Sequence, residues 1–170
     1  ANYSNENENL IIILHGFGDG PESFYDLPEH WKLEKTAYLI LPGCDNLSDD
    51  LYPADDKNSK SLFSWFDYFD PKTCEWYDEF SLDVQKGCYN NIEQNLDKLI
   101  RTHLVKECGW NLDQIFLFGF SQGGTVALEY LYWLAQKHPD AHLGGVVGIS
   151  TQLLGATRKQ ICNLEKDEPH

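Results

Sequence analysis

The sequence has no long apolar stretch, and its longest purely aliphatic run extends only from Leu10 to Leu14. A helix that crosses a membrane needs about 20 apolar residues, so we expect no integral membrane segment. Basic residues are also scarce, because 13 Lys and Arg stand against 27 Asp and Glu, which gives a formal net charge of −14. A field of this sign repels phosphate backbones, and we therefore expect no nucleic acid as a partner.

The five cysteines follow no pattern of a disulfide framework or a metal site. They stand at positions 44, 74, 88, 108 and 162, without a CxxC pair or a Cys/His spacing typical of zinc ligands. An odd number of this kind indicates free thiols in a reducing compartment. No charged region followed by an apolar one opens the chain, although a mature chain that had lost a secretory signal would look the same. We expect a cytoplasmic protein, with the nucleus as a further location.

The length and composition fit one folded domain, since 170 residues with 42% apolar side chains can bury a core. Continuous apolar runs predict strands that are buried on both faces, over residues 10–14, 37–41, 115–118 and 144–150. Helical spacing predicts helices over 82–108, between a Ser81 N-cap and Gly109, over 122–137 and, more weakly, over 22–34. Strands that alternate with helices indicate an α/β fold with a mostly parallel sheet.

Residues 42–81 follow neither period and are too long for a routine connection, so we interpret them as a functional loop or an insertion. Between positions 45 and 79, ten acidic and three basic residues give a net charge of −7. The same stretch holds eight aromatic residues: Tyr52, Phe63, Trp65, Phe66, Tyr68, Phe69, Trp76 and Tyr77. Two interpretations stay open, an acidic solvated loop held by aromatic anchors and a loop that walls an apolar substrate groove.

The strongest motif is the segment GFSQGG at residues 119–124, which directly follows one predicted strand and precedes a predicted helix. This is the context of a G-x-S-x-G nucleophile elbow. The sharp turn strains the backbone at Ser121, while Gly119 and Gly123 lack the Cβ atoms that would collide with the flanking strand and helix. The motif therefore predicts that Ser121 is a catalytic nucleophile, presented at the positive end of a helix.

A second glycine-rich segment, HGFGDG at residues 15–20, directly follows the first predicted strand. A loop of this type supplies the other backbone N–H of an oxyanion hole. We expect the N–H groups of Phe17 and Gln122 to hold the developing negative charge, with Gly16 allowing the backbone to approach a substrate closely. His15 is expected to hold the loop by hydrogen bonds rather than to act as a base.

The motifs HGFGD, Trp65-Phe66-Asp67 and GFSQGG occur in an order that resembles the acyl-protein thioesterase / phospholipase-carboxylesterase family of α/β-hydrolases. The resemblance covers roughly residues 10–150. It implies an α/β-hydrolase core, Ser121 as nucleophile, oxyanion N–H groups from Phe17 and Gln122, and Trp65 near the acyl-binding site. With the neighbouring Phe66, Trp65 is our candidate for substrate binding. The resemblance further implies thioester, lysophospholipid or short-ester substrates, and neither a cofactor nor a metal.

A catalytic Asp and His with the expected setting are not found in this chain. The triad of this fold runs Ser, Asp, His, with the last two after later strands. The candidates beyond Ser121 are the acids Glu129, Asp140, Glu165, Asp167 and Glu168 and the histidines His138, His142 and His170. No acid/His pair among them has the expected setting directly after a later strand, and the segment after 144–150 has the character of a polar loop before another strand. We therefore predict that residues 1–170 form a single, incomplete α/β-hydrolase domain, truncated before its last strands.

The first functional prediction is a serine hydrolase that cleaves acyl thioesters or esters through an acyl-enzyme on Ser121. A lipidated protein carrying S-palmitoyl groups, or a lysophospholipid, is the expected substrate. Two alternatives stay open: a short-chain carboxylesterase, and a catalytically inert protein of the same fold that binds acyl groups or a partner protein. The missing acid and histidine favour the inert protein, whereas the two glycine-rich loops favour the enzyme.

Overall fold

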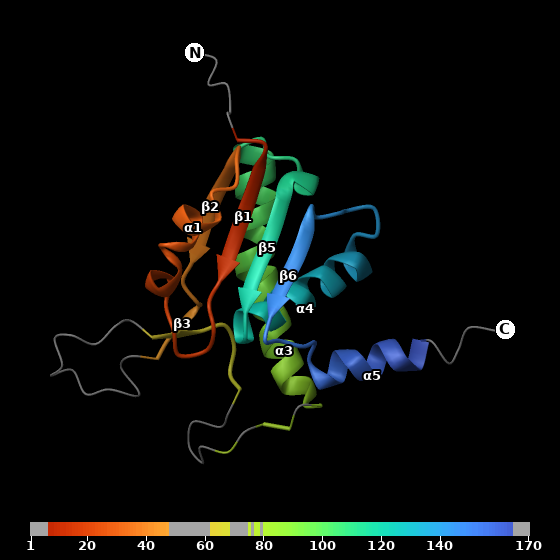
Figure 1. The fold of residues 1–170 in the computed structure, drawn as a ribbon. Coiled ribbons are helices and arrows are strands. Elements are labelled where there is room, and N and C mark those ends of the chain that lie inside the picture. Colours follow the sequence, from red (N-terminus) through yellow and green to blue (C-terminus); the bar gives the residue numbers. More distant parts are fainter. Residues whose placement is uncertain (1–6, 48–61, 69–74, 76, 79, 165–170) are drawn as a thin grey trace, which may run out of the picture.

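The computed structural model describes residues 7–47, 62–68, 75, 77–78 and 80–164, and its centre is a parallel sheet. The four strands of this sheet are β1 (Asn9–Leu14), β2 (Thr36–Leu41), β5 (Ile115–Phe120) and β6 (Gly145–Ile149). They lie in the order β2-β1-β5-β6, and Figure 1 shows their arrows pointing the same way. The four strands predicted from apolar runs are thus confirmed, and so is the parallel pairing of the strand that precedes Ser121.

Helices cover one face of the sheet and form the main core with it. Behind the sheet in Figure 1 lie α3 (Leu82–Asn91), the π-helical η2 (Ile92–Glu107) and α4 (Gln122–Lys137). Alternate residues of the central strands point to this layer, and Ile12 of β1 and Ile115 of β5 are fully buried there. On the opposite face Phe118 packs edge-on against Trp31, with ring centroids 4.9 Å apart. The sheet therefore has apolar residues on both faces, as the continuous runs predict.

The ends of the long helical segment follow the sequence signals. Ser81 caps α3, since its Oγ accepts hydrogen bonds from the N–H groups of Asp83 and Val84 at 3.3 and 3.5 Å. Beyond η2 the chain turns at Gly109, whose φ of +82° lies in the left-handed region that glycine adopts without strain. No helix within the described ranges is both long and apolar enough to span a membrane.

Two sequence predictions need correction. The weak helix over 22–34 is two short pieces, η1 (Pro21–Phe24) and α1 (Leu27–Trp31), and Lys32 ends the second with a left-handed φ of 49°. The segment after β6 is not a polar loop, because α5 (Gly155–Leu164) begins a few residues beyond the strand. The helix has few apolar residues, but its start is buried, since Ala156 and the preceding Leu154 are each 4% exposed.

The described part of the segment 42–81 includes a small two-stranded sheet. β3 (Asp45–Asn46) pairs antiparallel with β4 (Phe63–Ser64), and residue 63 also bridges to Asp19 in the first glycine-rich loop. Part of the predicted loop lies outside the described residues, including Tyr52, Phe69 and Trp76, and so do the candidates Glu165, Asp167, Glu168 and His170. The described part of the segment is therefore attached to the carboxyl edge of the sheet.

Candidate active site

Ser121 stands at a strained turn between β5 and α4. Its φ of 51° and ψ of −118° lie outside the regions that L-residues usually adopt. A Cβ at Gly119 would meet the Gly123 carbonyl oxygen at 2.5 Å, and one at Gly123 would meet the His15 carbonyl oxygen at 2.4 Å. The turn is therefore compatible only with glycine at both flanking positions, which agrees with the geometry expected of a nucleophile elbow.

Two backbone N–H groups of the elbow, those of Ser121 and Gln122, differ in whether they already have an acceptor. The Ser121 N–H donates to the Ile149 carbonyl at 2.9 Å, which ties the elbow to the end of β6. Gln122 is the first residue of α4, so its N–H has no acceptor within the helix. Of these two donors, the one from Gln122 suits a developing oxyanion at the positive end of the helix.

His15 holds the first glycine-rich loop through both of its ring nitrogens. Nδ1 lies 2.7 Å from the Gly16 carbonyl oxygen, and Nε2 accepts from the Gly43 N–H at 2.8 Å. This pairing assigns the proton to Nδ1 of a neutral ring. The side chain is fully buried, and this burial lowers its pKa below the usual 6.5. His15 thus joins β1 to the segment after β2.

The side chain of Gln122 attaches the aromatic segment at residues 65–66 to the elbow. Its Oε1 accepts from the Trp65 N–H at 2.9 Å, and its Nε2 donates to the Phe66 carbonyl at 2.7 Å. The Trp65 indole Nε1–H donates to the His15 carbonyl at 2.8 Å, while the Asn91 amide donates to the Trp65 carbonyl. The backbone of this segment is therefore fixed from three sides.

Trp65 and Phe66 are each 3% exposed and belong to the core. This burial supports the interpretation that the two residues are aromatic anchors of an acidic loop. Both also border a cavity of about 460 Å³ beside α3, which includes Asp45 and Asp67. Their contact with a substrate stays a prediction. The structural role of the Gln122 side chain was missed, because only the backbone of this residue enters the motif.

A separate cavity of about 350 Å³ opens at Ser121. Its lining consists mainly of hydroxyl and amide side chains: Phe17, Tyr68, Ser121, Gln122, Thr125, Ser150, Thr151 and Gln152. The structure thus brings the predicted nucleophile and both predicted oxyanion donors to one cavity. It also adds the segment 150–152, which the sequence did not single out.

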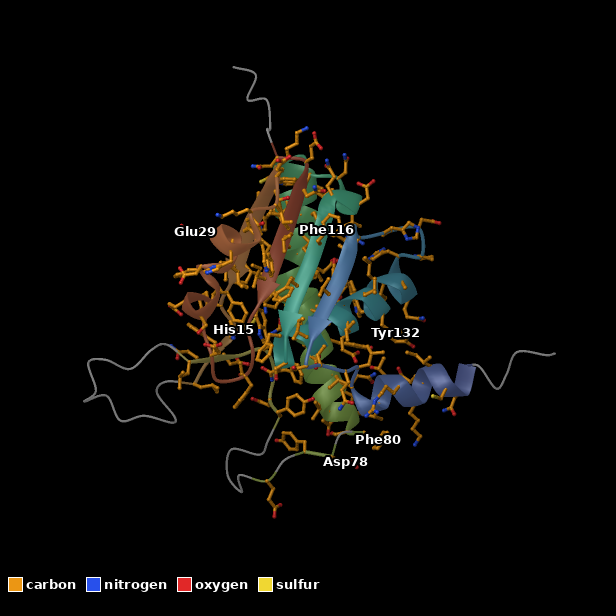
Figure 2. The ribbon with its side chains drawn as sticks, in the orientation of Figure 1. His15, Glu29, Asp78, Phe80, Phe116 and Tyr132 are labelled. Atoms are coloured by element: carbon orange, nitrogen blue, oxygen red, sulfur yellow. The ribbon has the colours of Figure 1, made fainter. Side chains whose placement is uncertain are left out.

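No histidine or carboxylate is among the described residues that line this cavity. His138 ends α4 with its ring against Trp133, and His142 lies in the α4–β6 connection. Figure 1 shows this connection at the opposite end of the sheet, and Asp140 lies there too. In Figure 2, His15 lies at the carboxyl end of β1, but its ring nitrogens are engaged as described.

Glu129 is also unsuited to orient a catalytic histidine. It lies two helical turns beyond Ser121 on α4, is fully buried, and accepts hydrogen bonds from the Leu154 N–H and the Thr157 hydroxyl. The described ranges also hold no group of three or more His, Cys, Asp or Glu side chains arranged to bind a metal. The described cavity thus brings together the expected nucleophile and the expected oxyanion donors, and no described residue that lines it is a candidate base.

Sequence comparison finds relatives along most of the chain. The profile of the family described as phospholipase/carboxylesterase matches residues 1–164. An uncharacterized hydrolase of Mycosarcoma maydis is 31% identical over 150 residues, which cover 86% of this chain and 50% of the relative. An uncharacterized hydrolase of Schizosaccharomyces pombe is 30% identical over 140 residues, covering 81% of this chain and 51% of the relative. The chain therefore spans about half the length of the curated relatives it matches.

Solved structures share the fold at lower sequence identity. SOBER1 of Arabidopsis thaliana superimposes with a TM-score of 0.58 at 22% identity, over 86% of this chain and 62% of that protein. The esterase PE8 gives a TM-score of 0.62 at 18% identity, over 91% of this chain and 63% of that protein. Both solved proteins have the same α/β architecture, and both are longer than the part that this chain covers.

Proposed function

The chain belongs to the phospholipase/carboxylesterase family of α/β-hydrolases, and on this premise we propose that it carries the nucleophile of a serine esterase. Ser121 attacks the carbonyl carbon of an ester or thioester, an acyl-enzyme forms as the alcohol or thiol leaves, and water then releases the acid. The N–H groups of Phe17 and Gln122 stabilise the negative charge on the tetrahedral oxygen. The observation that supports the proposal is the strained Ser121 turn at the start of α4, open to a cavity.

The general base and its acid partner are proposed to lie outside the described residues. A serine hydroxyl is a weak nucleophile without a base to accept its proton. The described lining of the Ser121 cavity includes no group that accepts this proton, and the relatives are about twice as long as the matched part. Activity is therefore assigned to the full-length protein.

A short acyl group suits the described cavity better than a palmitoyl chain. Most residues that line it carry a hydroxyl or amide group, and its aromatic lining residues are Phe17 and Tyr68. Trp65 and Phe66 are buried and border the other cavity, so they do not extend this one into a long apolar groove. A long apolar chain gains about 0.8 kcal/mol for each CH₂ that it buries, which requires an apolar groove. We therefore favour short-chain esters or thioesters, with S-palmitoyl proteins and lysophospholipids as the competing substrates.

Covalent labelling with a fluorophosphonate tests the nucleophile. Mass spectrometry of digested full-length protein should find the label on Ser121, and heat-denatured protein should stay unlabelled. Ser121→Ala should abolish labelling and ester hydrolysis together. Labelling that persists in this variant refutes the assignment. A folded wild-type protein that neither reacts nor hydrolyses esters would instead favour the inert binding protein.

A series of acyl thioesters from C4 to C16 tests the substrate class. For a short-chain esterase, kcat/KM should be highest near C4 and should not rise with chain length. A groove for palmitoyl groups predicts the reverse, with kcat/KM increasing up to about fifteenfold for each added pair of fully buried CH₂ groups. Such an increase would reject the short-chain proposal and restore the lipidated substrate.

A further inference from the structure

Three residues at four-residue spacing, the Ser121 cap and two residues of α4, bind the end of β6 and the segment that follows it. The Ser121 N–H donates to the Ile149 carbonyl at 2.9 Å, and the Thr125 hydroxyl donates to the Gln152 carbonyl at 3.0 Å. One turn further, the Glu129 carboxylate accepts from the Leu154 N–H at 2.7 Å. Thr125 and Glu129 lie on one face of α4 and Ser121 caps the start of that helix, so these bonds form a continuous row.

Glu129 is the most deeply buried member of this row. Its second oxygen accepts from the Thr157 hydroxyl at 2.7 Å, and the Thr157 oxygen in turn accepts from the Gln85 amide at 2.7 Å. The Tyr89 hydroxyl lies 3.4 Å from the same Thr157 oxygen. A single carboxylate therefore joins α4 to the start of α5 and, through Thr157, to α3.

The segment held by this row forms one wall of the cavity at Ser121. Ser150, Thr151 and Gln152 line the cavity, and they lie between the contacts to Ser121 and Glu129. Ser150 has a left-handed φ of 52°, so its conformation depends on the bonds around it. If the hydrogen bonds at Glu129 are lost, residues 150–152 of the cavity wall are held in place by fewer contacts.

We propose that Glu129 is a positioning residue, which fixes residues 150–157 against α4 and thereby sets the wall that contacts the substrate. The proposal rests on Ser121 being the nucleophile of an esterase, because it assigns the wall to substrate binding. A buried carboxylate is costly unless its oxygens are hydrogen-bonded, and here both oxygens have partners. An apolar residue of similar size would fill the same space but leave the Leu154 N–H and the Thr157 hydroxyl without this acceptor.

Substitution of Glu129 in the full-length protein separates positioning from packing. Glu129→Met keeps the side-chain length and removes both acceptors, whereas Glu129→Gln keeps an oxygen for the Leu154 N–H. We expect Glu129→Met to raise KM for p-nitrophenyl butyrate about tenfold and Glu129→Gln to raise it less than about threefold. Titration of active sites with a fluorophosphonate should give the same active fraction for both variants as for the wild type. Glu93→Met, on the exposed surface of η2, is the matched control and should change neither quantity.

The alternative outcomes are distinct. A purely structural role predicts a smaller titrated fraction with unchanged KM, and this result would overturn the proposal, as would wild-type behaviour of Glu129→Met. If Glu129→Met does not fold, Thr157→Val removes one of the two bonds and should raise KM in the same direction. Hydrogen exchange does not depend on activity: peptides covering 149–157 should exchange at least about tenfold faster in Glu129→Met than in the wild type. Unchanged exchange refutes the row itself, whereas a wild-type protein that stays unlabelled at Ser121 refutes only the proposed function.

Discussion

The Gln122 side-chain oxygen accepts the backbone N–H of Trp65 at 2.9 Å, so the residue that begins the elbow helix also holds the aromatic segment. Its amide nitrogen donates to the Phe66 carbonyl at 2.7 Å. One residue therefore has two roles: its backbone faces the expected oxyanion and its side chain fixes a segment some 57 positions earlier in the chain. Loss of the side chain should affect stability even where the backbone donor is retained.

Gln122→Leu should destabilise the protein. It leaves the Trp65 N–H and the Phe66 carbonyl buried without these partners, at about 1–3 kcal/mol for each group. We expect the free energy of unfolding, measured by urea titration, to fall by about 3 kcal/mol. Gln136→Leu, on the exposed side of the same helix, should change it by less than about 0.5 kcal/mol. Equal effects of the two substitutions would contradict the attachment role.

Gly123→Ala should disrupt the elbow more than an ordinary helix substitution. The added Cβ would lie 2.4 Å from the carbonyl oxygens of Leu14 and His15, which are backbone atoms of the central strand and the loop after it. We expect a loss of about 3 kcal/mol or more in unfolding free energy. The control is Gly87→Ala in α3, where a Cβ meets nothing within 4 Å. This change should stabilise the protein by about 0.5–1 kcal/mol, since alanine favours a helix.

His15 should make the protein less stable in mild acid. Burial lowers the pKa of His15, so the unfolded chain binds this proton at a higher pH than the folded one. Stability from the neutral ring is therefore complete above the unfolded pKa of about 6.5, and it is lost as the pH falls through the folded value. His15→Gln should lack this loss when urea titrations are compared between pH 8 and pH 5. His142→Gln, at an exposed position, should retain it, and identical pH profiles for all three proteins would reject the prediction.

Glu129 should show a pH dependence of the opposite sign. Burial raises the pKa of its carboxyl group, although the bonds from Thr157 and Leu154 oppose this shift, and the titratable groups that face it are Cys88 and Tyr89 of α3. The folded protein then holds a proton that the unfolded chain has released above its pKa of about 4.5. Stability relative to Glu129→Gln should therefore decrease as the pH rises from about 4.5 through the folded pKa and then stay constant. A difference that is independent of pH between 4 and 8 would show that Glu129 does not titrate in this way.

The sheet and the elbow can be predicted from the sequence because both depend on local patterns. The runs at Leu10–Leu14 and Ile115–Phe118 are apolar on both faces, and Gly119 is required by contacts with Gly123 and Gly124 inside the turn, so the motif is readable over six neighbouring positions. These features leave a direct trace in neighbouring positions. The order of amino acids alone is therefore enough to predict the fold class.

The remaining features depend on contacts between distant segments. The helix α5 was missed because its sequence has few apolar residues and is held by the buried Glu129 on another helix. The attachment of Trp65 to Gln122 was missed because an amide in a motif gives no sign of its acceptor. Tertiary hydrogen bonds of this kind have no periodicity, so a single sequence does not predict them.

The sheet order also has a consequence for how the protein folds. β1 lies between β2 and β5, so Leu10 pairs with Ala37 on one side and with Ile115 on the other. The first pairing closes a short loop, whereas the second must wait until about 105 further residues have been synthesised, and long loop closures slow folding. The His15–Gly20 loop borders an elbow that forms only when β5 and α4 arrive. Until then β1 and β2 have exposed edges, and the nascent chain is most prone to aggregate before Ser121 is in place.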